Sequence, residues 1–357
     1  MKLLSTVALA TLLLTAATAN AFEVKAYTGA PGKASLEDLS PTPDAPGNKD
    51  NIFYGEQYSF ATRVEGAANV WFQFGFSNLG AGSGRAIVQA DFTPTGGKPL
   101  SFKQAFARGD WTCEKAPLKL AFGKNTLAFD GTLWTVHIEA KEFTADYTLQ
   151  NLAAAWKPGD GIVDFGSEGA YRIQVVAPRA KLSGTVTLKD GTVHQISGFA
   201  YGDHSFTNMA PQKQARRWLR IRKIGARNTI MFHAMQTPEQ FGSRWVSWLV
   251  VAGEKGVMAS VVNPEVSFGE METDSPTGYT IPNTVFMKNE AGFQGAIKTS
   301  RRVDREDQLK GLSGAERMIV SKFIKPIAFK YDSKMELLWP GRKPLKANAR
   351  MFYDQMF

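Results

Sequence analysis

The chain has 357 residues, of which 43% are hydrophobic and 21% are charged, and this composition excludes intrinsic disorder, a collagen-like repeat and a coiled coil. A single cysteine, Cys113, excludes a disulfide framework, and four histidines leave little material for a metalloenzyme. The 33 glycines, 17 prolines and 24 phenylalanines favour an all-β chain with many turns, and the length predicts about two domains.

The first residues have the pattern of a secretory signal peptide. Lys2 supplies a positive charge, residues 3–17 form an apolar run, and Ala19-Asn20-Ala21 is a cleavage motif of small residues. The apolar run is shorter than the ~20 residues of a membrane-spanning helix. We therefore expect a signal peptide at residues 1–21, cleavage after Ala21, and a periplasmic or secreted protein.

Residues 22–50 contain Gly, Pro, Ser and Asp without periodicity, which predicts an irregular lead-in. From residue 51 onward the hydrophobic pattern has a period of two. Trp134, Val136 and Ile138, for example, alternate with polar residues, as expected of a strand with one buried face. The rest of the chain is therefore predicted to be a series of β-strands.

Turn motifs separate the predicted strands. Asp130-Gly131 and Asp190-Gly191 are typical of tight hairpins, and a third turn is expected at residues 253–256. Strands joined by hairpins at short intervals form a meander that closes into a barrel or stacks as a sandwich.

A different pattern interrupts the strands near the C-terminus. Ser313-Gly314-Ala315-Glu316 fits a capping box, apolar residues follow, and Pro326 ends the pattern. We expect a short helix here, with Met318 packed on the barrel. Two final strands are expected at residues 327–331 and 334–339, joined by a tight turn.

The densest group of reactive side chains lies in residues 198–205. Tyr201 and Asp203 are two positions apart, so on a strand they share one face, and His204 points to the other. A carboxyl group beside a tyrosine in a low-dielectric site has a raised pKa and can act as a proton donor. The alternative is structural: Asp203 caps a turn and His204 is a buried, hydrogen-bonded residue.

A basic and aromatic stretch follows. Arg217 and Trp218 begin a predicted strand in which Arg220 and Arg222 alternate with apolar residues. Arginine geometry suits a carboxylate or an anionic headgroup. The other interpretation is a solvated strand face, and the predicted export argues against a nucleic-acid partner.

Two further segments contain candidate ligand-lining residues. His233 and Met235 share one face of residues 230–236, and such a lining suits flexible apolar ligands. Trp245 and Trp248 are three positions apart, so only one of them can line a cavity. Ordinary core packing explains the same pattern. The sequence contains no metal-ligand spacing, phosphate-binding loop or GxSxG motif.

Three motifs follow one another in the middle of the chain: Val175-Val176-Ala177-Pro178-Arg179, Gly198-x-Ala200-Tyr201-x-Asp203-His204 and Arg217-Trp218. Together they resemble the AttH-like and carotenoid 1,2-hydratase (hydroxyneurosporene synthase) superfamily, whose relatives include the fungal survival-factor family and the lipocalin-like Diels–Alderases. The resemblance covers residues 54–248 and implies two consecutive lipocalin-like domains. In the hydratases the Tyr and Asp of the motif are implicated in protonating a carotenoid double bond. This implies catalytic roles for Tyr201 and Asp203.

We therefore expect an all-β fold of two tandem lipocalin-like barrels or half-barrels, with a short helix in the second. The N-terminal domain is expected at residues 51–205 and the C-terminal domain at residues 206–357, which places the Tyr201 motif near their junction. Junctions and barrel mouths are common ligand sites. The expected ligand-binding residues are His204, Arg217, Trp218, His233, Met235, Trp245 and Trp248.

Three functions agree with these observations. The leading one is an exported soluble protein that binds a hydrophobic lipid or isoprenoid and could transport it, with a basic surface that engages anionic membrane headgroups. The second is a hydratase, lyase or isomerase that needs no cofactor and uses Asp203 as general acid. The third is a structural envelope protein. No metal and no nucleic acid is expected as a partner.

Overall fold

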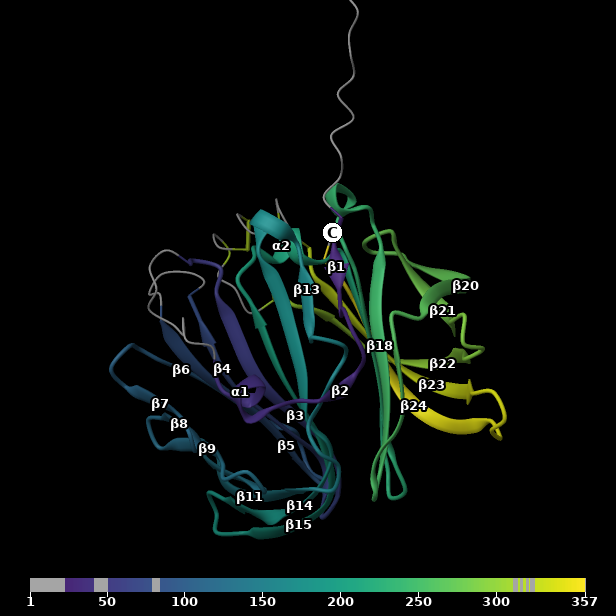
Figure 1. Cartoon of the computed structure of the whole chain (residues 1–357). Helices are drawn as coiled ribbons and strands as arrows, with labels where there is room; N and C mark the ends of the chain where they lie inside the picture. The colour runs from purple at the N-terminus through teal and green to yellow at the C-terminus, as the bar shows by residue number, and fades with distance from the viewer. Residues whose placement is uncertain are drawn as a thin grey trace, which may run out of the picture.

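The computed structural model describes residues 23–41, 51–78, 84–310, 314, 317–318, 321 and 325–356. Nearly all of this part of the chain is β-structure, in two antiparallel sheets that lie side by side (Figure 1). The first sheet curves into a nearly closed barrel and the second into a half-barrel, so the expected all-β, tandem lipocalin-like architecture is confirmed. Among the described residues, no helix has both the length and the apolar character needed to cross a membrane.

The first sheet contains the strands up to Thr207. Its long strands are β3 (Gly55–Glu65), β4 (Ala67–Ser77), β5 (Arg85–Pro94), β6 (Leu100–Phe106), β7 (Trp111–Lys115), β8 (Leu118–Phe122), β9 (Asn125–Phe129), β10 (Leu133–Glu139), β11 (Phe143–Asn151), β14 (Ala170–Leu188) and β15 (Val193–Thr207). They lie in the order β6-β5-β4-β3-β15-β14-β11-β10-β9-β8-β7. Two short strands, β12 (Trp156–Lys157) and β13 (Ile162–Asp164), pair with β14, and they pair in turn with β2 (Gly32–Lys33) and β1 (Lys25–Ala26).

Alternation along these strands fills the barrel with aromatic side chains. Phe60 on β3 and Phe72 on β4 are fully buried, and their rings stack with centroids 5.0 Å apart. Trp134 lies on β10, a strand that its alternation predicted. It is fully buried, and its ring stacks on that of Phe129 with centroids 4.4 Å apart. The interior of the barrel is therefore packed with protein side chains, and the outer face of β3 carries small and polar residues.

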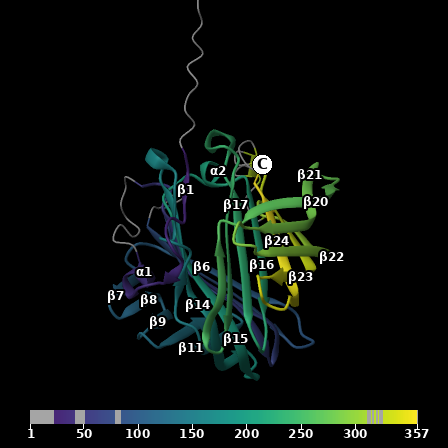
Figure 2. The same ribbon diagram turned by 45° about the vertical axis from the view of Figure 1, so that its right-hand side comes forward.

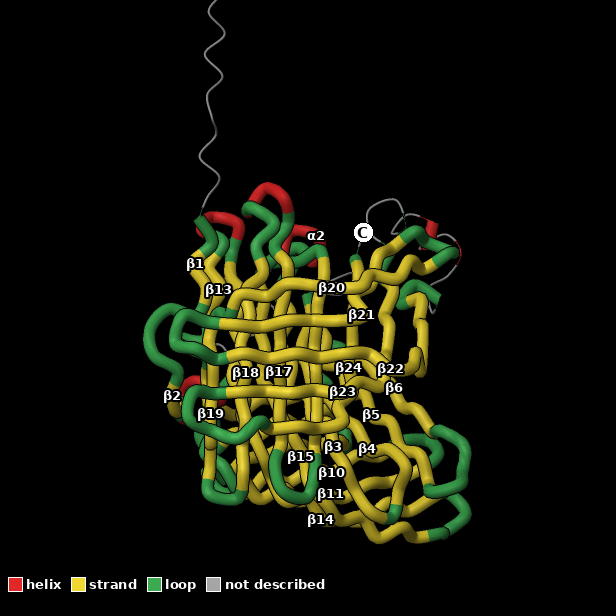
Figure 3. The backbone as a smooth tube through the Cα atoms, turned by 90° about the vertical axis from the view of Figure 1, so that its right-hand side faces the viewer, coloured by secondary structure: helices red, strands yellow, loops and turns green. Residues whose placement is uncertain are grey.

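The second sheet contains the strands from residue 217 onward. They are β16 (Arg217–Ile224), β17 (Thr229–Gln236), β18 (Trp245–Gly253), β19 (Gly256–Val262), β20 (Glu265–Asp274), β21 (Tyr279–Lys288), β22 (Gln294–Asp307), β23 (Ile327–Leu338) and β24 (Leu345–Gln355). Their order is β19-β18-β17-β16-β24-β23-β22-β21-β20. Figure 3 views this sheet from its far side, where β20 to β23 cross the molecule.

The turn motifs join neighbouring strands as predicted. Asp130-Gly131 lies between β9 and β10, and Asp190-Gly191 lies between β14 and β15. Gly131 and Gly191 have φ values of 100° and 89°, a region that favours glycine. Gly253 pairs with Gly256 across the turn between β18 and β19.

The predicted irregular lead-in is partly wrong. Its described residues form β1, β2 and the short helix α1 (Leu36–Leu39), which begins at a capping box of Ser35 and Asp38. The strands β1 and β2 run along the boundary between the sheets (Figures 1 and 2). They are ordered by pairing with β13 and β12, partners about 130 residues away that local periodicity does not reveal.

The predictions for the C-terminal strands are also wrong. β23 runs without a break through the expected turn, because its inward alternation continues from Tyr331 through Ser333 to Met335. Ser333 is buried and donates a hydrogen bond to the Ala349 carbonyl on β24, a strand that was not predicted. The helix expected at residues 313–326 lies mostly outside the described residues, and Met318, expected to pack, is 62% exposed.

The two sheets meet through a mixed interface of apolar side chains and one buried charge. Trp156 of the first sheet packs on Trp248 of the second, with ring centroids 5.5 Å apart. Arg179 on β14 is fully buried and donates hydrogen bonds to the carbonyl oxygens of Gly225 at 2.7 Å and Ala226 at 2.6 Å, in the turn after β16. The short helix α2 (Pro211–Gln214) lies in the connection between β15 and β16.

Candidate functional site

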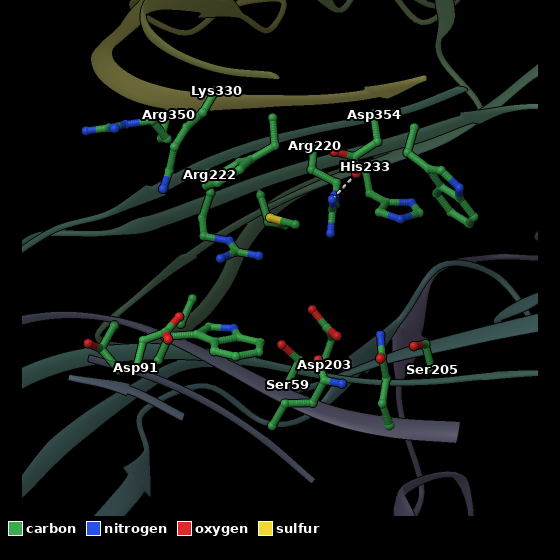
Figure 4. Close-up of a pocket in the computed structure, with 18 of the residues that line it drawn as sticks. Ser59, Asp91, Asp203, Ser205, Arg220, Arg222, His233, Lys330, Arg350 and Asp354 are labelled. Carbon is green, nitrogen blue, oxygen red and sulfur yellow. Dashed lines mark hydrogen bonds and ion pairs between the residues drawn. The ribbon is translucent and has the colours of Figure 1, made fainter. Parts of the chain in front are cut away.

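A cavity of about 1430 Å³ lies between the two sheets, beside the apolar part of their interface. One wall is the outer face of the barrel, from β3, β4, β5 and β15. The other wall is the outer face of the half-barrel, from β16, β17, β23 and β24. Figure 4 shows side chains from both walls pointing toward one another. The cavity thus lies at the junction of the sheets, outside the packed barrel interior.

The barrel wall carries small and polar groups in a register set by strand pairing. Asp203 on β15 lies opposite Ser59 on β3. Two residues along the same strands, Tyr201 lies opposite Ala61. Asp91 on β5 also lines the cavity and accepts a hydrogen bond from the Ser101 hydroxyl at 2.7 Å. These residues alternate with the inward core residues of the same strands, which explains why a polar row faces the second sheet.

The half-barrel wall is basic and aromatic. Trp218, Arg220 and Arg222 alternate on β16 with the buried residues Leu219 and Ile221, so the three side chains share the cavity face. Arg220 pairs across strands with His233 on β17 and with Phe352 on β24. Lys330, Arg350 and Asp354 add further charged groups from β23 and β24 (Figure 4).

Asp203 is the carboxyl group of the cavity whose pKa is shifted upward. Burial raises its pKa above the ordinary value, and the positive charge of Arg222 opposes part of that rise. Arg220 is engaged elsewhere, because it forms an ion pair with Asp354 on the same wall. A carboxyl group with a raised pKa keeps its proton to higher pH, which is the property a proton donor needs.

His233 on β17 is a buried, neutral imidazole that lies opposite Arg220. Burial, together with the charges of Arg220 and Arg222, lowers the pKa of His233 to about 3. Its ring stacks on Trp248 at 5.4 Å and lies 5.3 Å from the ring of Trp218. Its Nδ1 atom is buried and has no hydrogen-bond partner among the described residues. His233 therefore presents an uncharged ring in an aromatic surrounding.

Tyr201 shares the face of β15 that carries Asp203 and belongs to the buried cluster between the two sheets. Its side chain is fully buried, and burial together with the charge of Asp203 raises the pKa of its hydroxyl well above the ordinary value. The guanidinium carbon of Arg222 lies 5.7 Å from the centre of the Tyr201 ring. The structure thus brings Tyr201, Asp203 and Arg222 together from two sheets.

His204 does not line this cavity and points into the barrel. Its Nε2 lies 2.6 Å from Glu56 Oε1, and its ring stacks on Tyr58 at 4.2 Å. Its Nδ1 lies 3.2 Å from the carbonyl oxygen of Asp38 at α1. His204 instead borders a second cavity of about 710 Å³ at the barrel mouth. Its contacts are those of the structural alternative described above, a buried and hydrogen-bonded histidine.

Four other expected ligand residues also lie away from the cavity lining. Arg217 shares the inward face of β16 and contacts Tyr353, since alternation turns it away from Trp218. Met235 is completely buried between the sheets. Trp245 packs on Phe268 inside the half-barrel at 5.1 Å. Trp248 occupies the opposite face, as predicted, but it is fully covered by the first sheet.

Of the expected site residues, Asp203, Trp218 and His233 line the cavity together. The sequence analysis missed the groups contributed by distant strands: Ser59, Asp91, Lys330, Arg350 and Asp354. Alternation along β24 could have revealed part of this set, because Arg350, Phe352 and Asp354 alternate there with the buried residues Met351 and Tyr353. Within the described part of the chain, no three His, Cys, Asp or Glu side chains are grouped to hold a metal ion.

Comparison with known proteins gives one family match and several similar folds. The Svf1 family model matches residues 105–356. The chain is similar to a protein described as AttH from Nitrosomonas europaea (13% identity, 90% of this chain and 96% of that chain, TM-score 0.58). It is also similar to kievitone hydratase from Nectria haematococca (13%, 88% and 91%, TM-score 0.52) and to CghA with Sch210972 (11%, 92% and 98%, TM-score 0.58). A search of curated protein sequences finds no match.

Proposed function

This chain belongs to the Svf1 family, and we propose that it binds an unsaturated, partly apolar small molecule between its two sheets and transfers a proton to it from Asp203. The observation that carries this proposal is the position of Asp203. It is a carboxyl group on the wall of a large cavity, and burial raises its pKa although the arginines of the facing wall oppose that rise.

The reaction needs a single donor and a water molecule. A carbon of a ligand double bond takes the proton from the Asp203 carboxyl group, which becomes a carboxylate, and the neighbouring carbon becomes electron-deficient. Water adds to that carbon and returns a proton to Asp203, so the site is restored and the ligand is hydrated. The reverse sequence removes water. General acid catalysis of this kind typically contributes 10²–10⁴-fold to the rate.

Two similar structures support a small-molecule role. One is a hydratase by name, an enzyme class that adds water, and another is seen with the compound Sch210972. Both share the fold with this chain at low identity, so they support a ligand site without identifying the ligand.

Carriage of a lipid or isoprenoid without turnover is the second candidate. The volume of the cavity, about 1430 Å³, favours it, because most small-molecule sites are smaller, at roughly 300–1,000 Å³. Met231 and Trp218 supply apolar surface for a long chain. Export after cleavage at Ala21 belongs to the same proposal and rests on the sequence of residues 1–21 alone.

The two candidates differ in their dependence on Asp203. The experiment starts with native mass spectrometry of the purified chain to identify a bound small molecule, which is then incubated with the protein in D₂O. Donation by Asp203 predicts a deuterium at one ligand carbon, and Asp203→Asn should reduce that incorporation at least 100-fold while the ligand still binds. Asp146→Asn, an exposed residue of β11, is the matched control. Unchanged incorporation in Asp203→Asn would refute the donor role, and binding without any exchange would favour the carrier.

A further inference from the structure

We infer that the cavity holds a ligand with a carboxylate at one end and an apolar or aromatic group at the other, the carboxylate binding Arg222 and the apolar end lying against Trp218 and His233. This inference rests on the proposed role of the cavity as the ligand site. It adds the chemical class of the ligand and its orientation.

Arg222 differs from the other arginines on the same wall. Arg220 pairs with Asp354, and Arg350 lies 3.1 Å from Asp332. Arg222 lines the cavity, yet it makes no ion pair within 4.0 Å with any carboxylate in the part of the chain that the structure describes. Its Nε atom is buried and has no hydrogen-bond partner there. An incompletely paired guanidinium in a partly buried site is unfavourable, and an anionic ligand group would offset that cost.

A second cation, Lys330, contacts the same aromatic ring as Arg222. The guanidinium carbon of Arg222 lies 5.3 Å from the centre of the Phe352 ring, and Lys330 Nζ lies 5.6 Å from the same centre. Both side chains line the cavity, so two cations lie against one aromatic ring of β24. Guanidinium geometry matches a carboxylate through two parallel N–H donors.

The carboxyl groups facing this pair do not neutralise it. Asp203 and Asp91 lie on the opposite wall, and Asp304 pairs across strands with Lys330. The raised pKa of Asp203 reduces the negative charge that would compete with a ligand anion. Asp91 and Asp304 make no ion pair with Arg222 or Lys330.

The side chains of Trp218, Arg220 and Arg222 form a row along β16, and the end of this row at Trp218 is aromatic. Trp218 lies four residues from Arg222 on β16, which is ~13 Å along the strand. Trp218 packs edge-on against Tyr171 at 5.4 Å and borders the neutral ring of His233. Figure 4 shows Asp203 on the opposite wall, facing Arg220, which lies between Trp218 and Arg222 on β16. A ligand spanning the row would therefore present its central bonds to Asp203.

The test compares a charged and an uncharged version of one probe. Biphenyl-4-carboxylate and biphenyl-4-carboxamide are titrated into the full chain by isothermal calorimetry at low and moderate salt. The carboxylate should bind at least tenfold more tightly than the amide. Arg222→Gln should remove most of this preference by weakening the binding of the carboxylate far more than that of the amide, and Lys330→Gln should reduce the preference by a smaller factor. Arg227→Gln, an exposed residue in the turn after β16, is the matched control for the loss of one charge.

The outcomes separate this inference from the proposed function. Equal binding of the two probes, or a preference that survives both Arg222→Gln and Lys330→Gln, would overturn the anion site while leaving the cavity as a ligand site. Failure of both probes to bind would count against the cavity itself. Because Lys330 is less buried than the core, its variant remains informative if Arg222→Gln does not fold, as judged by circular dichroism.

Discussion

Asp203 and Arg222 lie on opposite walls of the cavity between the sheets, and each alters the acidity of the other. Burial raises the pKa of Asp203 and the charge of Arg222 opposes that rise; burial lowers the pKa of Arg222 and the charge of Asp203 opposes that fall. Asp203 lies on β15 of the first sheet and Arg222 on β16 of the second. Its properties therefore depend on how the two sheets are docked.

The first prediction concerns the titration of Asp203. Replacing Arg222 by Gln removes a positive charge that lowers the pKa of Asp203, so this pKa should rise further above the ordinary value of 3.8. A carboxyl donor is active below its pKa, so any activity should extend to higher pH in the variant. The measurement is a ¹³C NMR titration of aspartate-labelled protein, with Asp203→Asn used to assign the signal. A midpoint for Asp203 at or below 3.8 in the wild type would contradict the assignment of a donor role.

The second prediction concerns acid sensitivity. The pKa of His233 is about 3 in the folded chain and 6.5 for an ordinary histidine, so below pH 6.5 the unfolded chain binds more protons and stability falls. Between pH 6.5 and pH 5 the loss should be about 2 kcal/mol, and it should continue down to the folded pKa. Urea unfolding of the wild type and His233→Gln at pH 7 and pH 5 measures it. The variant should lose this part of the acid sensitivity, whereas His137→Gln, on the exposed face of β10, should retain it.

The third prediction concerns the docking of the sheets. Arg179→Met leaves the carbonyl groups of Gly225 and Ala226 without their donors at the interface, which should destabilise the fold by about 3 kcal/mol. Urea unfolding gives the change in free energy. Lys181→Met, an exposed neighbour on β14, should change stability by less than about 0.5 kcal/mol. Equal effects of the two substitutions would show that the hydrogen bonds of Arg179 contribute little.

The fourth prediction separates His204 from the ligand site. His204→Ala removes one hydrogen-bond partner of buried Glu56 and the ring stacked on Tyr58, and it should destabilise the chain by about 3 kcal/mol. Probe affinity in the cavity between the sheets should stay within about twofold, because His204 faces the barrel interior. Trp218→Ala should show the reverse: a weaker probe affinity with a smaller change in the unfolding free energy. If His204→Ala is fully folded and still loses much of its probe affinity, His204 is a ligand residue and the prediction is wrong.

Strand alternation was the most reliable guide within a single strand. It correctly separated Asp203 from His204 and Trp245 from Trp248, because side-chain direction in a strand depends only on the parity of the position. The prediction of a turn between two C-terminal strands failed, although alternation continues through β23. Asp332 and Ser333 look like turn residues in sequence, yet ion pairs from Arg301 and Arg350 and the bond to Ala349 hold them within the sheet.

The amino-acid sequence by itself determined the all-β class, the hairpin turns and which side chains share a face, because these follow from local periodicity and from glycine geometry. Only the tertiary structure decided which residues on the outer face of a strand border the cavity and which are covered by the other sheet. Trp248 and Trp218 both point toward the other sheet, but the first is covered by Trp156 and the second borders open space. Likewise, the pKa of Asp203 depends on burial between sheets and on Arg222, a residue of the second sheet. Such contacts arise from packing between strands far apart in the chain, which no local pattern records.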